Sequence, residues 1–187
     1  MAERLAAAIA AIDVANAEDP RGEEVVYSRR MSEWLEKLAP EASEALRLAA
    51  RAQHLRRWEI PRSSFPMDRI GYLKWRTTLY QFHADRVGEI LGLAGYEESL
   101  IARVQSLVKK ERLKVDAEAQ LLEDVICLVF LQYEFAEFMA QHEEPKVINI
   151  LQRTWKKMSP MGHEAALGLV ASLPEGARGV LQRALAS

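Results

Sequence analysis

The chain has a single cysteine, Cys127, among its 187 residues. One thiol cannot build a disulfide framework, and Cys127 lies in the most apolar stretch of the sequence, so we expect an inert buried thiol and a reducing compartment. Long hydrophobic runs are also missing, because the apolar run at residues 125–131 is far shorter than the roughly 20 residues that a membrane-spanning helix needs. We therefore expect a cytoplasmic protein without a membrane partner.

A surplus of positive charge is absent as well, since the formal net charge is −2. A dedicated duplex-DNA binder normally carries a broad basic surplus, which excludes that class of function. Hydrophobic residues make up 49% of the chain and charged residues 28%, as in ordinary globular proteins. At this length we expect one domain over residues 1–187, with a core that needs neither disulfides nor a structural metal.

The sequence shows no strand-like alternation, internal repeat or Gly/Ser-rich linker, and its periodicity is helical almost throughout. It predicts an all-α, single compact domain of eight or nine helices. The expected helices are residues 3–16, 24–38, 41–57, 71–93, 98–110, 117–142, 145–157, 160–172 and 176–185. Residues 59–70, with Pro61 and Pro66, form the one substantial irregular segment, and a loop of this kind in a helical domain is often functional.

Positive charge is concentrated in residues 47–76, where eight Lys or Arg residues face only two Asp or Glu residues and aromatic residues interleave. Guanidinium groups bind phosphate through paired hydrogen bonds and aromatic rings stack on bases, so this segment predicts a site for a nucleotide, another small phosphorylated ligand or RNA. The alternative is a solvated surface, and for Lys110 a role at a helix end. The expected ligand contacts are Arg57, Trp58, Arg62, Tyr72, Trp75, Arg76 and Lys110.

Glu123 and Asp124 stand at the head of an almost wholly apolar helix. A buried carboxylate needs a metal, a cation or several hydrogen bonds, so the two acids are either catalytic candidates or structural acids. His54 and His83 each lie within an expected helix. Together with Asp124 they are one way to assemble a nitrogen and oxygen site for Mn, Fe or Zn, although packing roles for the histidines are the alternative.

Several strings together resemble the domain-of-unknown-function family 4202 (DUF4202): AIDVANAEDP at 11–20, AARAQHLRRWEIPR at 49–62, GYLKWR at 71–76, LLEDVICLVFL at 121–131 and TWKKMS at 154–159. The likeness covers nearly the whole chain. Residues 156–159 are also similar to part of a nucleotide-binding loop of aminoacyl-tRNA synthetases. The chain lacks the Rossmann strand–helix pattern that such an enzyme requires, so we expect no synthetase activity.

A more distant resemblance is to the HD-domain phosphohydrolases, helical enzymes that hold divalent metals through histidines, a His-Asp pair and a later aspartate. It implies His54, His83 and Asp124 as ligands and Glu123 as a proton acceptor, although Ala84 separates His83 from Asp85 where that family has adjacent residues. The leading hypothesis is a metal-dependent phosphohydrolase-like enzyme acting on a nucleotide or related phosphorylated molecule. The alternative is a non-catalytic nucleotide-binding, RNA-binding or protein-interaction module.

Overall fold

The computed structural model describes residues 2–113 and 115–186. Every regular element in these two ranges is a helix and none is a strand, which confirms the predicted all-α class. Ten α-helices lie in the described residues: α1 (Ala2–Ala17), α2 (Glu23–Leu38), α3 (Glu44–Arg51), α4 (Arg69–Leu93), α5 (Glu98–Val108), α6 (Ala117–Val129), α7 (Phe135–Ala140), α8 (Glu144–Trp155), α9 (Pro160–Leu169) and α10 (Glu175–Ala186).

The chain divides into two compact units, Met1–Arg112 and Leu113–Ser187. The single domain expected from the length stays a prediction, and each unit is described by itself. Among the helices that the structure describes, none is both long and apolar enough to cross a membrane.

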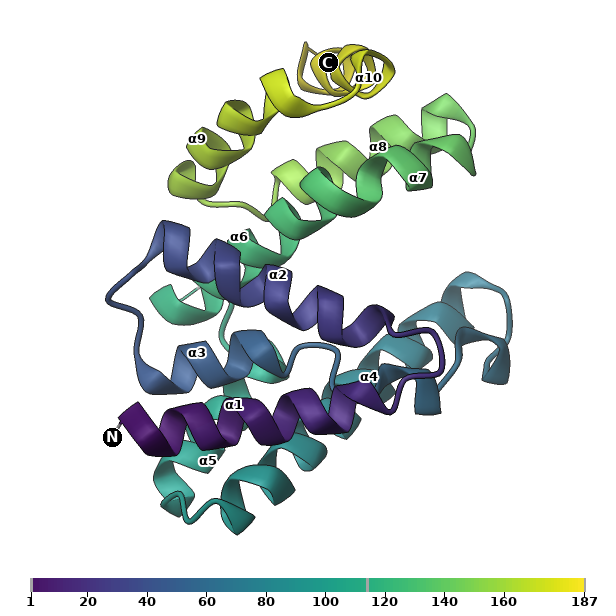
Figure 1. Cartoon of the computed structure of the whole chain (residues 1–187). Coiled ribbons are helices and arrows are strands. Elements are labelled where there is room, and N and C mark those ends of the chain that lie inside the picture. The colour runs from purple at the N-terminus through teal and green to yellow at the C-terminus, as the bar shows by residue number, and fades with distance from the viewer. Residues whose placement is uncertain (1, 114, 187) are drawn as a thin grey trace. The chain divides into compact units, whose positions relative to one another are not determined.

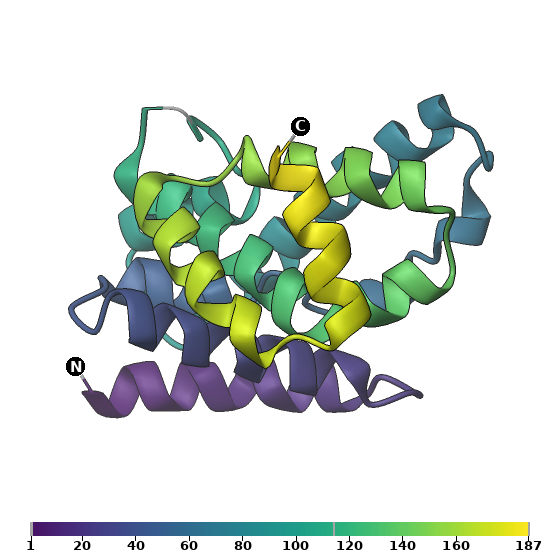
Figure 2. The same cartoon turned by 90° about the horizontal axis from the view of Figure 1, so that it is seen from above.

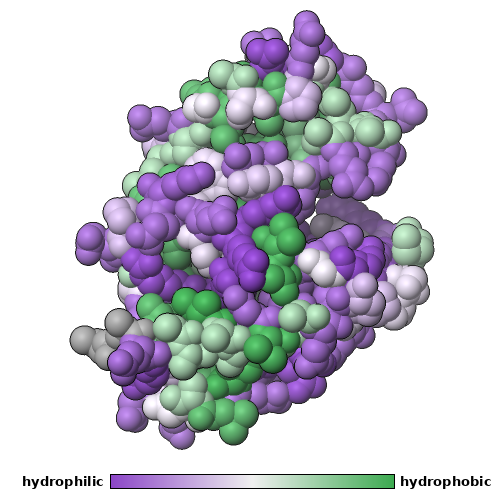
Figure 3. Space-filling view, in the orientation of Figure 1, coloured by the Kyte–Doolittle hydropathy of each residue, from purple (hydrophilic) through white to green (hydrophobic). Residues whose placement is uncertain are grey.

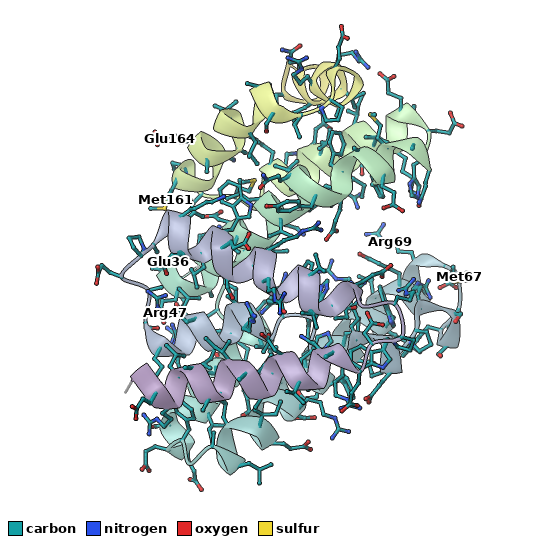
Figure 4. The ribbon with its side chains drawn as sticks, viewed as in Figure 1. Glu36, Arg47, Met67, Arg69, Met161 and Glu164 are labelled. Carbon is teal, nitrogen blue, oxygen red and sulfur yellow. The ribbon has the colours of Figure 1, made fainter. Side chains whose placement is uncertain are left out.

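The first unit contains α1 to α5. Helix α1 packs on α2, α3 and α4, and α5 packs on α3 and α4 (Figure 1). Exposed alanines give the outward face of α1 its pale green band in Figure 3. An ion pair of 2.6 Å between Glu36 of α2 and Arg47 of α3 joins two of these helices at the surface (Figure 4).

Side-chain oxygens define the starts of the helices that shape the site. The Asp19 carboxylate accepts hydrogen bonds from the backbone N–H groups of Arg21, Glu23 and Glu24, which fixes the first turn of α2. Ser43 accepts from Leu46 N at the start of α3. Short polar side chains at these positions satisfy backbone donors that have no partner inside the helix.

The expected helix at residues 41–57 is wrong at its C-terminal end, because α3 stops at Arg51 and the chain continues through turns. Arg56 has a left-handed backbone with φ of 55°, which no regular α-helix accommodates. Its N–H donates to Oδ1 of the fully buried Asn16 at 3.0 Å. This long-range hydrogen bond, invisible to local periodicity, holds the turn that presents Arg57 and Trp58, which lie in a short 3₁₀ turn (Arg57–Glu59).

The irregular segment before α4 is confirmed and is pinned at several points. Arg62 donates to the carbonyl oxygens of Phe65, Pro66 and Asp68. Gly71 is required where α4 begins, since a Cβ there would lie 2.0 Å from the Pro66 carbonyl oxygen. Met67 projects outward and is 79% exposed (Figure 4).

The second unit contains α6 to α10. Helix α6 packs against α9, and α10 packs along α8 (Figures 1 and 2). The expected helix at 117–142 is continuous in direction, but one π-helical turn, Phe130–Glu134, separates α6 from α7. The side chain of Asp116 caps α6, and that of Ser159 caps α9, where Pro160 fills the first helical turn as predicted.

Candidate functional site

Four side chains from three parts of the first unit form a continuous stack. The Tyr27 ring of α2 lies parallel to the His54 imidazole, with ring centroids 3.7 Å apart. Nη1 of Arg57 is 3.3 Å from both ring nitrogens of His54, which places it over the face of the imidazole rather than in line with either nitrogen. On the other side, the Arg57 guanidinium carbon lies 5.0 Å from the centre of the Trp75 ring. Arg57 is thereby held between two flat rings.

Trp75 is itself fixed. Its indole N–H donates to the Ile60 carbonyl at 2.8 Å, and the Arg62 guanidinium carbon lies 6.0 Å from its ring centre. Because Arg62 also donates to three carbonyls of the same segment, the segment and the start of α4 form one braced structure. The electrostatic consequence is a positive site whose geometry exists before any ligand binds.

This braced structure opens onto a pocket of about 470 Å³, within the range of roughly 300–1,000 Å³ that is typical of small-molecule sites. Three cationic side chains and four apolar or aromatic ones line it, with two acids at one side. The lining residues are Arg21, Glu23, Glu24, Arg57, Trp58, Ile60, Pro61, Arg62 and Trp75. Four of the predicted ligand contacts, Arg57, Trp58, Arg62 and Trp75, are therefore together in one pocket.

Glu24 is the one lining residue whose charge is strongly affected by its surroundings. It is 7% exposed, and burial raises its pKa to about 7, with Asp19 adding to the rise and Arg57 opposing it. Its Oε2 lies 3.4 Å from Nδ1 of His54, a distance too long for a strong hydrogen bond. Near neutral pH this carboxyl group is therefore ionised in only part of the molecules.

The two histidines of the first unit are neighbours, with ring centroids 6.2 Å apart. Burial lowers the pKa of His83 to about 4, and burial together with Arg57 holds the pKa of His54 well below its ordinary value. Nδ1 of the neutral His83 ring donates to the Leu55 carbonyl at 2.8 Å. Asp85, by contrast, is exposed and accepts a hydrogen bond from Gln81, so it does not act with His83 as a pair.

The predicted divalent-metal site stays a prediction. Across residues 2–113 and 115–186, the structure places no group of three or more His, Cys, Asp or Glu side chains where they could hold a metal ion. His54 and His83 belong to the first unit and Asp124 to the second. No step of the chemistry below passes through a metal.

The remaining predicted ligand contacts of the first unit gather around Tyr80 on α4. Arg76 hydrogen-bonds to the Tyr80 hydroxyl, and its guanidinium carbon lies 5.8 Å from the Tyr72 ring centre. Nζ of Lys110 is 5.6 Å from the Tyr80 ring centre. Arg76, Tyr72 and Lys110 thus form a second cation–aromatic group, and none of them lines the pocket.

The acidic pair predicted on α6 is buried, as its position in an apolar helix indicates, with Glu123 3% and Asp124 1% exposed. The Asp124 carboxylate accepts hydrogen bonds from N–H and Oγ of Ser159 and from Gln120. Lys157 lies 3.4 Å from Glu123. These contacts show how α6 holds the start of α9, and they satisfy Asp124 without a metal or a substrate.

Two residues of the site were missed from the sequence, Glu24 and Tyr27. A signal for Glu24 was present, because it shares a helical face with the buried Ser28, Met31 and Leu35. An acid on such an inward face is unusual enough to mark a site. Tyr27 gave no comparable signal, since its stacking on His54 depends on the packing of α2 against the segment after α3.

Comparison with the curated proteins and with the solved structures finds no match. A family model matches residues 6–181, nearly the whole chain, and is described as Domain of unknown function (DUF4202). The match agrees with the strings of sequence from which the family was expected, three of which surround the braced pocket and the stack behind it. The chain belongs to the DUF4202 family.

Proposed function

We propose that the first unit binds a small phosphorylated molecule, with the phosphate held by Arg57. The observation that carries this proposal is the state of the Arg57 guanidinium. It is fixed between His54 and Trp75 on the wall of the pocket, and among the described residues no carboxylate lies within ion-pairing distance of it. Its charge and its hydrogen-bond donors are available to an anion.

Contrast with the neighbouring arginines supports this assignment. Arg56 pairs with Glu18 and Glu59, and Arg62 donates to backbone carbonyls. Both therefore use their charge or donors to hold the protein. Arg57 differs because its contacts are with ring faces, which orient a guanidinium without neutralising it.

The neutral state of the surrounding histidines adds to the argument. His54 and His83 carry little charge near neutral pH, so they do not repel Arg57 and do not compete with it for the anion. Glu24 is the one nearby acid with an ionised fraction that opposes anion binding. Its raised pKa keeps that fraction well below the value for an exposed glutamate.

Binding of adenosine monophosphate (AMP) and of ribose 5-phosphate, measured by isothermal titration calorimetry, tests the proposal. Replacing Arg57 with Gln is expected to weaken both by roughly 10-fold or more, because a hydrogen bond to a charged group contributes about 1.5–3 kcal/mol. Arg57→Lys keeps the charge but loses the planar fork, so we expect an intermediate affinity. Arg69→Gln, an exposed position outside the pocket, serves as the control and should leave affinity unchanged.

The same titrations distinguish a free ligand from RNA. A small-molecule site predicts that a short RNA oligonucleotide binds no more tightly than AMP, since the pocket is lined by a limited set of side chains. Tighter RNA binding with a steep salt dependence would favour the RNA-binding alternative. Equal affinities in the wild-type protein and in Arg57→Gln would refute the proposed role of Arg57.

A further inference from the structure

The wall of the pocket beside Arg57 is apolar and aromatic, and a phosphate group alone does not account for it. Trp58, Ile60 and Pro61 contribute this wall. Trp58 is neither buried nor fully exposed, and no other aromatic ring contacts it in the described part of the chain. An indole left open on the wall of a cationic pocket is suited to a second planar group.

One face of the Trp58 ring is already covered. The Arg56 guanidinium carbon lies 5.6 Å from the ring centre. Arg56 is absent from the wall of this pocket and lines a different one, together with Glu59 and residues of α4. The guanidinium therefore covers the face turned away from the pocket, and the opposite face is the one that a ligand meets.

Arg56 is itself immobilised, which makes Trp58 a rigid platform. Its side chain pairs with Glu18 at 2.7 Å and with Glu59. Its backbone is held in the left-handed region by the hydrogen bond from its N–H to Asn16. Backbone strain of this kind persists only where the surrounding structure enforces it, and here it fixes the ring next to Arg57 in the sequence.

Trp75 cannot serve in the same way. Arg57 and Arg62 both lie over its ring and its N–H is used by the Ile60 carbonyl. The two tryptophans of the pocket therefore have different roles: Trp75 orients arginines, and Trp58 offers a face.

We propose that Trp58 stacks on a planar nitrogenous base, so that the phosphorylated ligand of this pocket is a nucleotide. This inference rests on the proposed phosphate site at Arg57 and adds the identity of the second group. The pocket volume of about 470 Å³ accommodates a base, a ribose and a phosphate. Stacking tolerates any base, so the structure assigns the class of ligand and not the base.

The test compares AMP with ribose 5-phosphate, which differ by the base alone. We expect the wild-type protein to bind AMP roughly 5- to 150-fold more tightly, the range that stacking on an aromatic side chain provides. Trp58→Leu should reduce this ratio to near one while leaving the affinity for ribose 5-phosphate within about threefold of wild type. Trp58→Phe keeps a ring and should retain most of the preference.

Trp155→Leu is the matched control, because Trp155 lines a separate pocket in the second unit. It should preserve the AMP preference. An equal loss of both ligands in Trp58→Leu would overturn the stacking role, as would a wild-type protein that binds both ligands equally well. Binding of neither ligand by the wild-type protein would instead refute the phosphate site itself, so the two proposals fail in different ways.

Discussion

The Glu24 carboxyl group offers a direct test of the electrostatics of the pocket. It is 7% exposed, and burial raises its pKa from 4.5 to about 7. A raised pKa in the folded state means that the folded protein binds this proton more tightly than the unfolded chain does. The contribution of Glu24 to stability is therefore fully present below pH 4.5 and is lost as the pH rises through 7.

The size of the effect follows from the shift. The difference between 4.5 and about 7, at 1.36 kcal/mol per pH unit, corresponds to roughly 3 kcal/mol, most of which is lost between pH 5 and pH 8. His83 acts in the opposite direction. Its lowered pKa, about 4, removes stability as the pH falls below its ordinary value of 6.5. A comparison of variants at each pH isolates Glu24 from this second effect.

Glu24→Gln replaces the carboxyl group with a neutral side chain of similar shape. Urea unfolding at pH 5 should find the variant within about 1 kcal/mol of wild type, because the wild-type carboxyl is then protonated in most folded molecules. At pH 8 the variant should gain roughly 2–3 kcal/mol relative to wild type. The adjacent Glu23→Gln, at an exposed position, should show no such pH-dependent gain.

A variant that differs from wild type by the same free energy at pH 5 and pH 8 would refute the reasoning. That result would mean that water or a rearranged Arg57 stabilises the ionised carboxylate. The same variant should also bind AMP more tightly at pH 8, because it removes the negative charge that opposes the anion.

The second unit yields two further predictions. Asp124→Asn should lower the free energy of unfolding by roughly 1–3 kcal/mol, because the carboxylate that accepts from Ser159 is lost, and should leave AMP affinity unchanged; a stable variant with impaired binding would restore Asp124 as a functional residue. Gly162→Ala should also destabilise by roughly 1–3 kcal/mol in thermal or urea unfolding, because its Cβ would lie 2.6 Å from an Asp124 oxygen. Gly168→Ala on the same helix meets nothing within 4 Å and should instead stabilise by roughly 0.5–1 kcal/mol. Equal effects at both glycines would show that helix propensity, and not the contact with Asp124, decides the outcome.

Helix periodicity succeeded where the physics is local. Residues 98–108, for example, were expected as a helix on the spacing of their apolar residues, and Ser159 was expected as a cap on its chemistry alone. It failed at the end of α3, where the apolar pattern continues but the backbone does not. The cause is Asn16, which is 40 residues from Arg56 in the sequence and accepts the hydrogen bond that stabilises the left-handed turn.

The candidate site shows the same division. Composition alone indicated an anionic-ligand segment, because arginine and tryptophan interact with phosphates and bases wherever they are accessible. Composition could not separate Arg57 from Arg56 and Arg62, since all three have the same charge. That distinction depends on which partners the fold supplies: carboxylates for Arg56, carbonyls for Arg62 and ring faces for Arg57.

The sequence by itself determined the helical class, the family and the segment that carries the cationic and aromatic side chains, because these follow from local periodicity and from the chemistry of single residues. Only the tertiary structure decided which of those side chains share a pocket, that Glu24 and Tyr27 join them, and that Asp124 is satisfied by Ser159. The physical reason is that burial, stacking and ion pairing depend on distances between segments that are remote in the chain. Those distances arise when helices pack, and no single segment encodes them.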